Sequence, residues 1–294
     1  MSSPPRARRR TVASVLFRGG TYVALFLVLS PALWLLGGIL AHAVSHWHWS
    51  VLWTPFKQDA SGGLAGPILG TLVLMGGVLV VAGTVGVLTG VHLAEMARAR
   101  RSGRPGGELL RTASDVLSGF PSIVLGFVFF EALVVGLHWG YSLVPAVLVL
   151  SVMVVPYIAK STEVALRQVP DNYREGAEAL GMSQGYTLRK IVLRSGAPGI
   201  VTGLLIALAI AGGETAPLIY TAGFAGSWTG AFIHGHGFPY LTYVVWEYWD
   251  YPNKQANILS YDAGLILVVM VLVLLVAARL IIARTQRHAE GRAA

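Results

Sequence analysis

Long apolar runs separated by polar segments dominate the chain. The runs cover residues 20–41, 67–94, 112–137, 141–159, 199–222 and 258–283. A helix needs about 20 apolar residues to cross the hydrocarbon core of a bilayer, and these runs have that length. The pattern therefore predicts six transmembrane helices. Residues 20–41 are expected to remain in the mature protein, because this apolar stretch is too long for a signal peptide.

The composition supports a membrane protein and excludes other classes. Hydrophobic residues make up 54% of the 294 residues and charged residues 12%, whereas soluble domains carry about 25% charged residues. The high hydrophobicity also excludes a disordered chain, which has the opposite composition. The absence of cysteine excludes disulfides, thiolate catalysis and cysteine-bound metals. The expected fold class is an all-α polytopic membrane protein.

Lys and Arg are distributed unevenly among the polar segments. Twenty of the 22 lie in 1–19, 95–111, 160–198 and 279–294, and one each lies in 42–66 and 223–257. The positive-inside rule then places both termini in the cytoplasm, with 1–19 as a basic N-terminal segment and 284–294 as a tail. Residues 223–257 are expected to form a periplasmic loop. The net charge of +8 is thus a topology signal, and we expect no nucleic-acid partner.

Motifs for covalent chemistry are missing from the sequence. It contains no G-x-x-x-x-G-K-[ST], H-E-x-x-H or G-x-S-x-G, so an intramembrane enzyme would lack a recognisable nucleophile or metal site. The histidines of 42–48 and 234–236 have no acidic or cysteine neighbours at metal-ligand spacing. Any dependence on ATP is therefore expected to reside on another chain.

The polar segment 160–198 is too long for a turn and has a helical pattern. A gap at 182–185 separates two helical halves, and the second half has an apolar side around Ile191 and Leu193. A short amphipathic helix of this kind can lie on lipid head groups or dock into a soluble partner. The residues alone leave both interpretations open.

The same segment carries a motif that decides between them. Glu175-Gly176-Ala177, then Gly181, then Ile191-Val192-Leu193 resembles the signature loop of ABC-importer permeases. The resemblance implies a type I ABC importer permease fold with a cytoplasmic coupling helix that docks on an ATPase subunit. The implied coupling residues are Glu175, Gly176, Ala177, Gly181, Ile191 and Leu193. Where that family has Pro, this chain has Arg194, and we expect Pro198 to supply the turn instead.

Two further motifs narrow the resemblance. Ser118-Gly119-Phe120-Pro121-Ser122-Ile123-Val124-Leu125-Gly126 and Gly213-Glu214-Thr215-Ala216-Pro217-Leu218 resemble the A-type permease family of phosphate-specific ABC transporters. The resemblance covers about 64–225, the expected core permease domain. It implies an inner-membrane location and four kinds of partner: membrane lipid, a second homologous permease subunit, two ATP-binding subunits and a periplasmic phosphate-binding protein. ATP would be bound by the partner, and no cofactor by this chain.

Polar residues within the apolar spans are the candidates for a translocation pathway. Glu214 and Glu131 lie in predicted spans, where an ionisable group costs about 2.5–3.5 kcal/mol on insertion scales. Thr215, Ser118 and Ser122 complete the candidate set. The alternatives are that Glu214 pairs with backbone groups or with a partner's basic side chain, and that the serines satisfy the helix backbone.

Inorganic phosphate is the substrate that the resemblance implies. A protonated phosphate can donate its O–H to a carboxylate, which fully ionised sulfate cannot do. Another oxyanion, such as phosphonate or molybdate, is the first alternative, and an intramembrane enzyme or structural membrane subunit is the second. The third and fifth spans contain acidic residues but no Lys or Arg, so positive charge for an anion pathway is expected from a partner.

Overall fold

The structure is a computed structural model that describes residues 5–101, 108–227, 230 and 232–290, with side chains described for 14–95, 109–227, 230 and 232–283. The helices are α1 (Pro5–His46), η1 (Trp49–Leu52), α2 (Ala65–Arg101), α3 (Glu108–Ser118), α4 (Ser122–Phe129), η2 (Phe130–Gly136), α5 (Leu143–Arg167), α6 (Asp171–Ala179), α7 (Gln184–Thr187), η3 (Leu188–Val192), α8 (Leu193–Gly213), α9 (Ala216–Thr221), α10 (Leu241–Tyr248) and α11 (Lys254–Glu290). Two short strands, β1 (Gly140–Tyr141) and β2 (Gly235–His236), pair in parallel. Residues up to His48 form one compact unit and residues from Trp49 form a second.

The first unit consists of the single helix α1. Its described apolar part, Ser14–His46, is long enough to cross a membrane and contains the predicted span 20–41. Pro31 lies inside the helix, a position that membrane helices tolerate better than helices of soluble proteins.

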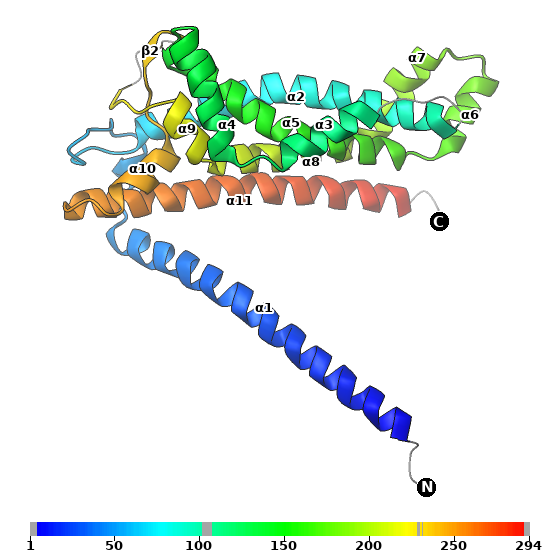
Figure 1. The fold of residues 1–294 in the computed structure, drawn as a ribbon, viewed down its shortest axis with the longest axis horizontal. Coiled ribbons are helices and arrows are strands. Elements are labelled where there is room, and N and C mark those ends of the chain that lie inside the picture. The colour runs from blue at the N-terminus through cyan, green and yellow to red at the C-terminus, as the bar shows by residue number, and fades with distance from the viewer. Residues whose placement is uncertain (1–4, 102–107, 228–229, 231, 291–294) are drawn as a thin grey trace. The chain divides into compact units, whose positions relative to one another are not determined.

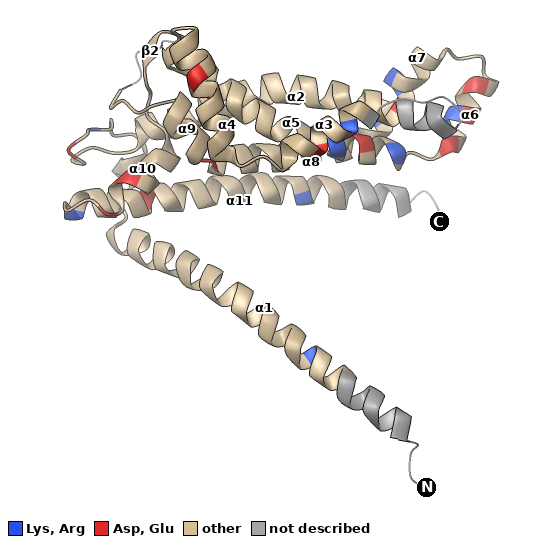
Figure 2. Ribbon diagram, in the orientation of Figure 1, with Lys and Arg blue, Asp and Glu red and all other residues tan. Residues whose placement is uncertain are grey.

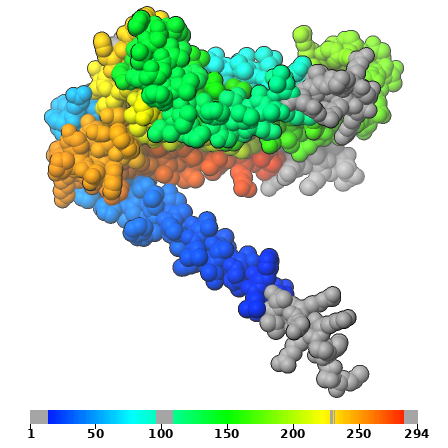
Figure 3. Space-filling model, in the orientation of Figure 1, coloured from blue at the N-terminus to red at the C-terminus, as the bar shows by residue number. Residues whose placement is uncertain are grey.

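The second unit is a helical bundle with α5 at its centre (Figure 1). Helix α5 contacts α2 and α8, α8 contacts α11, and α10 contacts α11. The core is formed by α2, α5 and α8 and includes the fully buried Leu74, Leu150 and Val154. In Figure 3, α3 and α4 lie on the surface of the view shown. The apolar runs of the sequence thus pack around one central helix.

Glycines allow the backbones of α2 and α8 to approach α5 closely. A Cβ atom added at Gly86 would lie 2.7 Å from the Ile158 Cβ atom. One added at Gly203 would lie 2.6 Å from the Ser161 Cβ atom. Small residues at helix contacts are the usual means of packing where lipid offers no hydrophobic driving force between helices. The two glycine faces therefore hold α5 between its neighbours.

The described helices confirm the predicted spans in part. Five of them are long and apolar enough to cross a membrane, or up to six when one bent pair is taken as a single span. That pair corresponds to the predicted third span, 112–137, which is not a continuous helix: its two halves meet at an angle of 100°. The fourth span extends beyond the predicted end at residue 159, because α5 continues to Arg167.

The segment 223–257 is folded into the bundle and is not a loop throughout. It contains β2 and α10, and Phe238 and Tyr240 are each only 1% exposed. The backbone N–H of Leu241 donates to the Thr71 hydroxyl of α2 at 2.9 Å. Burial of aromatic side chains and this hydrogen bond fix the segment, which the sequence alone predicted to be a periplasmic loop, against the bundle.

We predict that Gly90→Ala destabilises the protein. The added methyl group would lie 2.5 Å from the Ala159 carbonyl oxygen and 2.5 Å from the Thr162 Cβ atom, so α2 and α5 would have to move apart. Overpacking of this kind costs about 1–3 kcal/mol. The melting temperature of the purified protein in detergent is expected to fall. Gly76→Ala on the same helix is the matched control, because nothing lies within 4 Å of its added methyl group. Equal melting temperatures for both variants would contradict the proposed packing.

Candidate functional site

The short helix α6 and the turn after it contain four of the six predicted coupling residues. Glu175 and Gly176 are exposed on α6, whereas Ala177 is 3% exposed and faces the bundle. Gly181 follows the helix with a φ of +72°. The Gly181 N–H donates to the Glu178 carbonyl and the Met182 N–H donates to the Ala177 carbonyl, which is the Schellman arrangement that a glycine favours. Gly181 therefore ends α6 and turns the chain toward α7.

An ion pair fixes α6 against the end of α2. The Arg174 guanidinium donates to both carboxylate oxygens of Glu95, at 2.9 and 3.3 Å. The Arg174 side chain is 11% exposed and that of Glu95 36%. A two-point contact between a guanidinium and a carboxylate fixes orientation as well as distance. The sequence did not reveal this contact, because its residues lie 79 positions apart.

Ile191 and Leu193 lie on a long helix and not on a separate amphipathic one. Helices α7, η3 and α8 continue without a break from Gln184 to Gly213. Both residues are partly buried, and Leu193 packs against a cluster that includes Leu166 and Val192. The helix passes through Arg194 and Pro198, so the turn expected at Pro198 is wrong.

The bend in the third span lies within the first of the two specific motifs. Helix α3 ends at Ser118, and α4 begins after Pro121, whose ψ of 128° is extended. Pro121 has no N–H to donate to the carbonyl four residues earlier, so a continuous helix is disfavoured there. The Ser118 hydroxyl donates to the Asp115 carbonyl at 2.9 Å. This bond supports the interpretation that Ser118 satisfies helix backbone.

A second break lies within the other specific motif. Helix α8 ends at Gly213, Glu214 is extended with a ψ of 137°, and α9 begins with Pro217 in its first turn. Pro217 cannot donate to the Gly213 carbonyl. The carbonyl of Glu214 instead accepts the Thr242 hydroxyl of α10 at 3.0 Å. Glu214 therefore lies at a junction between helices and not inside the predicted continuous span.

The two breaks meet. Helices α4 and α9 are in contact, and a Cβ atom added at Gly126 would lie 2.6 Å from the Cα atom of Pro217. The Phe127 and Tyr220 rings make an edge-to-face contact with centroids 6.1 Å apart. The Ser122 side chain lies near the Glu214 carboxylate. Two candidate pathway residues from different motifs are thus brought together.

The remaining candidates are Thr215 and Glu131. Thr215 follows Glu214 at the same junction, and its carbonyl accepts the N–H of Leu218. Glu131 is exposed on η2. Thr242, which supports the Glu214 backbone, was not predicted because it lies in a segment that the motifs do not include.

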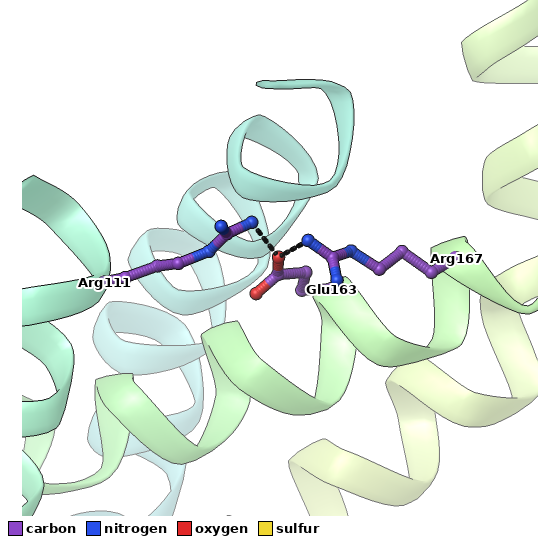
Figure 4. Close-up of polar contacts among 3 residues, drawn as sticks. All are labelled: Arg111, Glu163 and Arg167. Atoms are coloured by element: carbon purple, nitrogen blue, oxygen red, sulfur yellow. Dashed lines mark hydrogen bonds and ion pairs between the residues drawn. The ribbon is translucent and has the colours of Figure 1, made fainter. Parts of the chain in front are cut away.

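A cavity of about 490 Å³ lies between α3 and α5, and Ser118 is part of its wall. One oxygen of Glu163 accepts two guanidinium groups, from Arg111 of α3 at 2.7 Å and from Arg167 of α5 at 2.6 Å. Figure 4 shows both guanidinium groups pointing at Glu163. These three residues join α3 to α5 near α6. Figure 2 shows charged residues gathered at this end of the second unit, with few in its middle.

Among the side chains that the structure describes, no group of three or more His, Asp or Glu residues is arranged to hold a metal ion.

Comparison with known proteins identifies the family. The family model for the binding-protein-dependent transport system inner membrane component matches residues 82–288. The phosphate transport system permease protein PstA 2 of Mycobacterium bovis is 51% identical over 282 residues, covering 95% of this chain and 92% of that protein. PstA of Xylella fastidiosa is 32% identical over 76% of each chain.

Solved structures agree at the level of the fold. An inward-facing structure of the MetNI methionine ABC transporter has a TM-score of 0.54 and 22% identity, covering 76% of this chain and 97% of that one. A second crystal form of MetNI gives a TM-score of 0.52. These structures support the type I importer permease fold that the signature loop implied. The family works with ATP-binding subunits and a substrate-binding protein, and its members are transport subunits and not enzymes. This chain belongs to the family of binding-protein-dependent transport system inner membrane components.

Proposed function

We propose that this chain is a permease subunit of an ATP-driven importer that carries inorganic phosphate across the inner membrane. The observation that supports the substrate most directly is the 51% identity, over 95% of the chain, to a protein named as a phosphate transport permease. The two specific motifs add support, because their helix breaks lie against each other and bring Ser122 to Glu214.

The orientation follows from the basic segments. The positive-inside rule places α6, α7 and both termini in the cytoplasm and 223–257 in the periplasm. Helix α6 is then the coupling helix. Its surface exposes Glu175 together with two apolar side chains, Tyr173 at 51% and Leu180 at 75% exposure. Exposed apolar side chains beside charges are typical of a docking surface, and we assign this one to the ATPase subunit, which binds the ATP.

The remaining partners follow from the permease fold. A second homologous permease would complete a pathway of which this chain forms half. Two ATP-binding subunits would dock on the coupling helices, a periplasmic phosphate-binding protein would dock on the opposite face, and membrane lipid would cover the exposed apolar helices. ATP-driven closure of the ATPase pair would act through α6 to switch access between the two sides.

Glu214 has a chemical role in this proposal. Phosphate near neutral pH retains at least one proton, so it can donate an O–H hydrogen bond to a carboxylate, whereas ionised sulfate only accepts. The carboxylate of Glu214, with Ser122 beside it, would accept that hydrogen bond. Binding of phosphate would then be favoured over binding of sulfate. The same site would hold a phosphonate less selectively, because that group also carries protons. Phosphonate and molybdate remain the alternative substrates.

The proposed substrate is tested by uptake into proteoliposomes containing the assembled transporter and its binding protein. We expect ATP-dependent accumulation of labelled phosphate that excess unlabelled phosphate abolishes and excess sulfate leaves unchanged. Accumulation of labelled molybdate or a phosphonate in place of phosphate would assign another substrate. Absence of ATP-dependent uptake of any of these anions would contradict the transport assignment itself.

The ion pair between Arg174 and Glu95 predicts a reciprocal pattern in mutants. Arg174→Glu alone places two carboxylates together, and Glu95→Arg alone places two guanidinium groups together. Each single variant is expected to transport less phosphate per ATP hydrolysed, because α6 is no longer fixed to α2. The double variant restores opposite charges. We expect its loss of coupling to be smaller than the sum of the two single losses, by about 0.5–3 kcal/mol. Additive losses in the double variant would show that the pair does not position α6.

A further inference from the structure

Leu93, Pro156 and Val164 give the cavity between α3 and α5 part of an apolar wall, and polar side chains of both helices complete its lining. On α3 the lining residues are spaced three and four apart, at Arg111, Ser114, Asp115 and Ser118, which places them on one face of a helix. On α5 the polar lining residues are Tyr157, Lys160, Glu163 and Arg167. Helices that met only to bury apolar surface would not place charged side chains between them, so the charged residues of this cavity need another explanation.

The charges in the cavity favour an anion. Its wall carries three cations, Arg111, Lys160 and Arg167, and two carboxylates, Asp115 and Glu163. Among the described side chains, Lys160 is exposed and makes no ion pair. Positively charged side chains therefore outnumber negatively charged ones in the lining of the cavity.

Hydrogen-bond donors also remain available. Arg111 and Arg167 each use one terminal nitrogen on the same oxygen of Glu163 (Figure 4). A guanidinium has five N–H donors, and these side chains are 31% and 48% exposed. Glu163 thus holds the two guanidinium groups in place without using all their donors. A planar, fixed set of N–H groups suits a tetrahedral oxyanion.

We propose that this cavity is a binding site for hydrogen phosphate at the cytoplasmic mouth of the pathway. Lys160 and Arg111 bind the anion's oxygens, and the Asp115 carboxylate accepts its O–H, as Glu214 does at the junction of the breaks. The inference rests on the proposed function and extends it. On this proposal the chain itself supplies part of the positive charge for the anion, which the sequence alone led us to expect from a partner.

The ligand chemistry distinguishes a free anion from a lipid. The phosphate of a phosphodiester head group carries negative charge but no P–O–H proton near neutral pH, so Asp115 would repel it. Free hydrogen phosphate satisfies both the cations and the carboxylate. Ionised sulfate has the charge without the proton and is expected to bind more weakly.

The chain contains no cysteine, so one introduced thiol reports on the cavity. Ser114→Cys in the assembled transporter is reconstituted in phosphatidylcholine liposomes and labelled from the cytoplasmic side with a membrane-impermeant maleimide. The label is read on this chain's own gel band. Val164→Cys, on the facing helix, lines the same cavity with a side chain 48% exposed and serves as a second reporter. Ala283→Cys on α11 is exposed outside the cavity and serves as the control thiol.

We expect added phosphate to protect the cavity thiols and not the control, and sulfate to protect less. Lys160→Gln should raise the phosphate concentration for half protection roughly tenfold, the loss expected for one charge-assisted hydrogen bond. Arg279→Gln removes an exposed cation of α11 outside the cavity and should leave protection unchanged. Asp115→Asn should make sulfate protect as well as phosphate does.

Three results would overturn the proposal. The first is labelling of both cavity thiols at the same rate with and without phosphate. The second is equal protection by sulfate and phosphate in the unaltered cavity. The third is protection that needs no added phosphate but appears when phosphatidylglycerol is included, which would assign the cavity to lipid. ATP-driven phosphate uptake is measured on the same samples. Uptake without protection rejects only this site. Absence of uptake by the transporter with no introduced cysteine rejects the proposed function.

Discussion

The backbone at the two helix breaks must be satisfied inside an apolar environment, and the arrangement of the bundle depends on this requirement. Lipid offers no hydrogen bonds, so a broken helix is stable only where protein surrounds it. Pro121 and Pro217 each interrupt an apolar span. The short helices that follow them, α4 and α9, lie against each other, with no room for a side chain at Gly126. At the second break, the Thr242 hydroxyl donates a hydrogen bond to the Glu214 carbonyl.

The unbroken helices provide the frame that holds these breaks. Helix α5 runs through the centre, and glycines bring α2 and α8 onto it. With these three helices fixed, the bent span can lie along α5. Its α3 half contributes the polar cavity wall, and its α4 half meets α9. The polar chemistry therefore follows one bent span, from Arg111 through Ser118 to Ser122. At the α6 end, the contact between Arg174 and Glu95 joins the coupling helix to α2.

The sequence predicted the parts of this structure that depend on local pattern. Hydropathy located the apolar runs, the motifs located both prolines, and the glycine after α6 has the positive φ of a helix cap. Hydropathy averages over a window, so it could not detect a 100° bend within the third run. It also ended the fourth span at residue 159, because Lys160, Glu163 and Arg167 look like a loop until the cavity that accommodates their charges is known.

Long-range pairing explains most of what the sequence could not predict. Arg111 and Glu163 lie 52 positions apart, and Thr242 lies 28 positions after Glu214. No periodicity relates such residues, since their contact depends on how whole helices pack. Pro198 shows the converse. A proline was expected to end a helix by its local effect, but packing of Leu193 and its neighbours keeps the helix continuous.

Cross-linking between α4 and α9 tests whether the two broken spans meet. Phe127→Cys and Tyr220→Cys place the only two thiols of the chain where two aromatic rings now touch. After reaction with a short bismaleimide, intact mass distinguishes one linker that bridges both thiols from two linkers that are each attached at one end. The structure predicts one bridging linker per chain in the membrane-reconstituted protein. Two singly attached linkers would show that α4 and α9 are apart and that the two breaks do not meet.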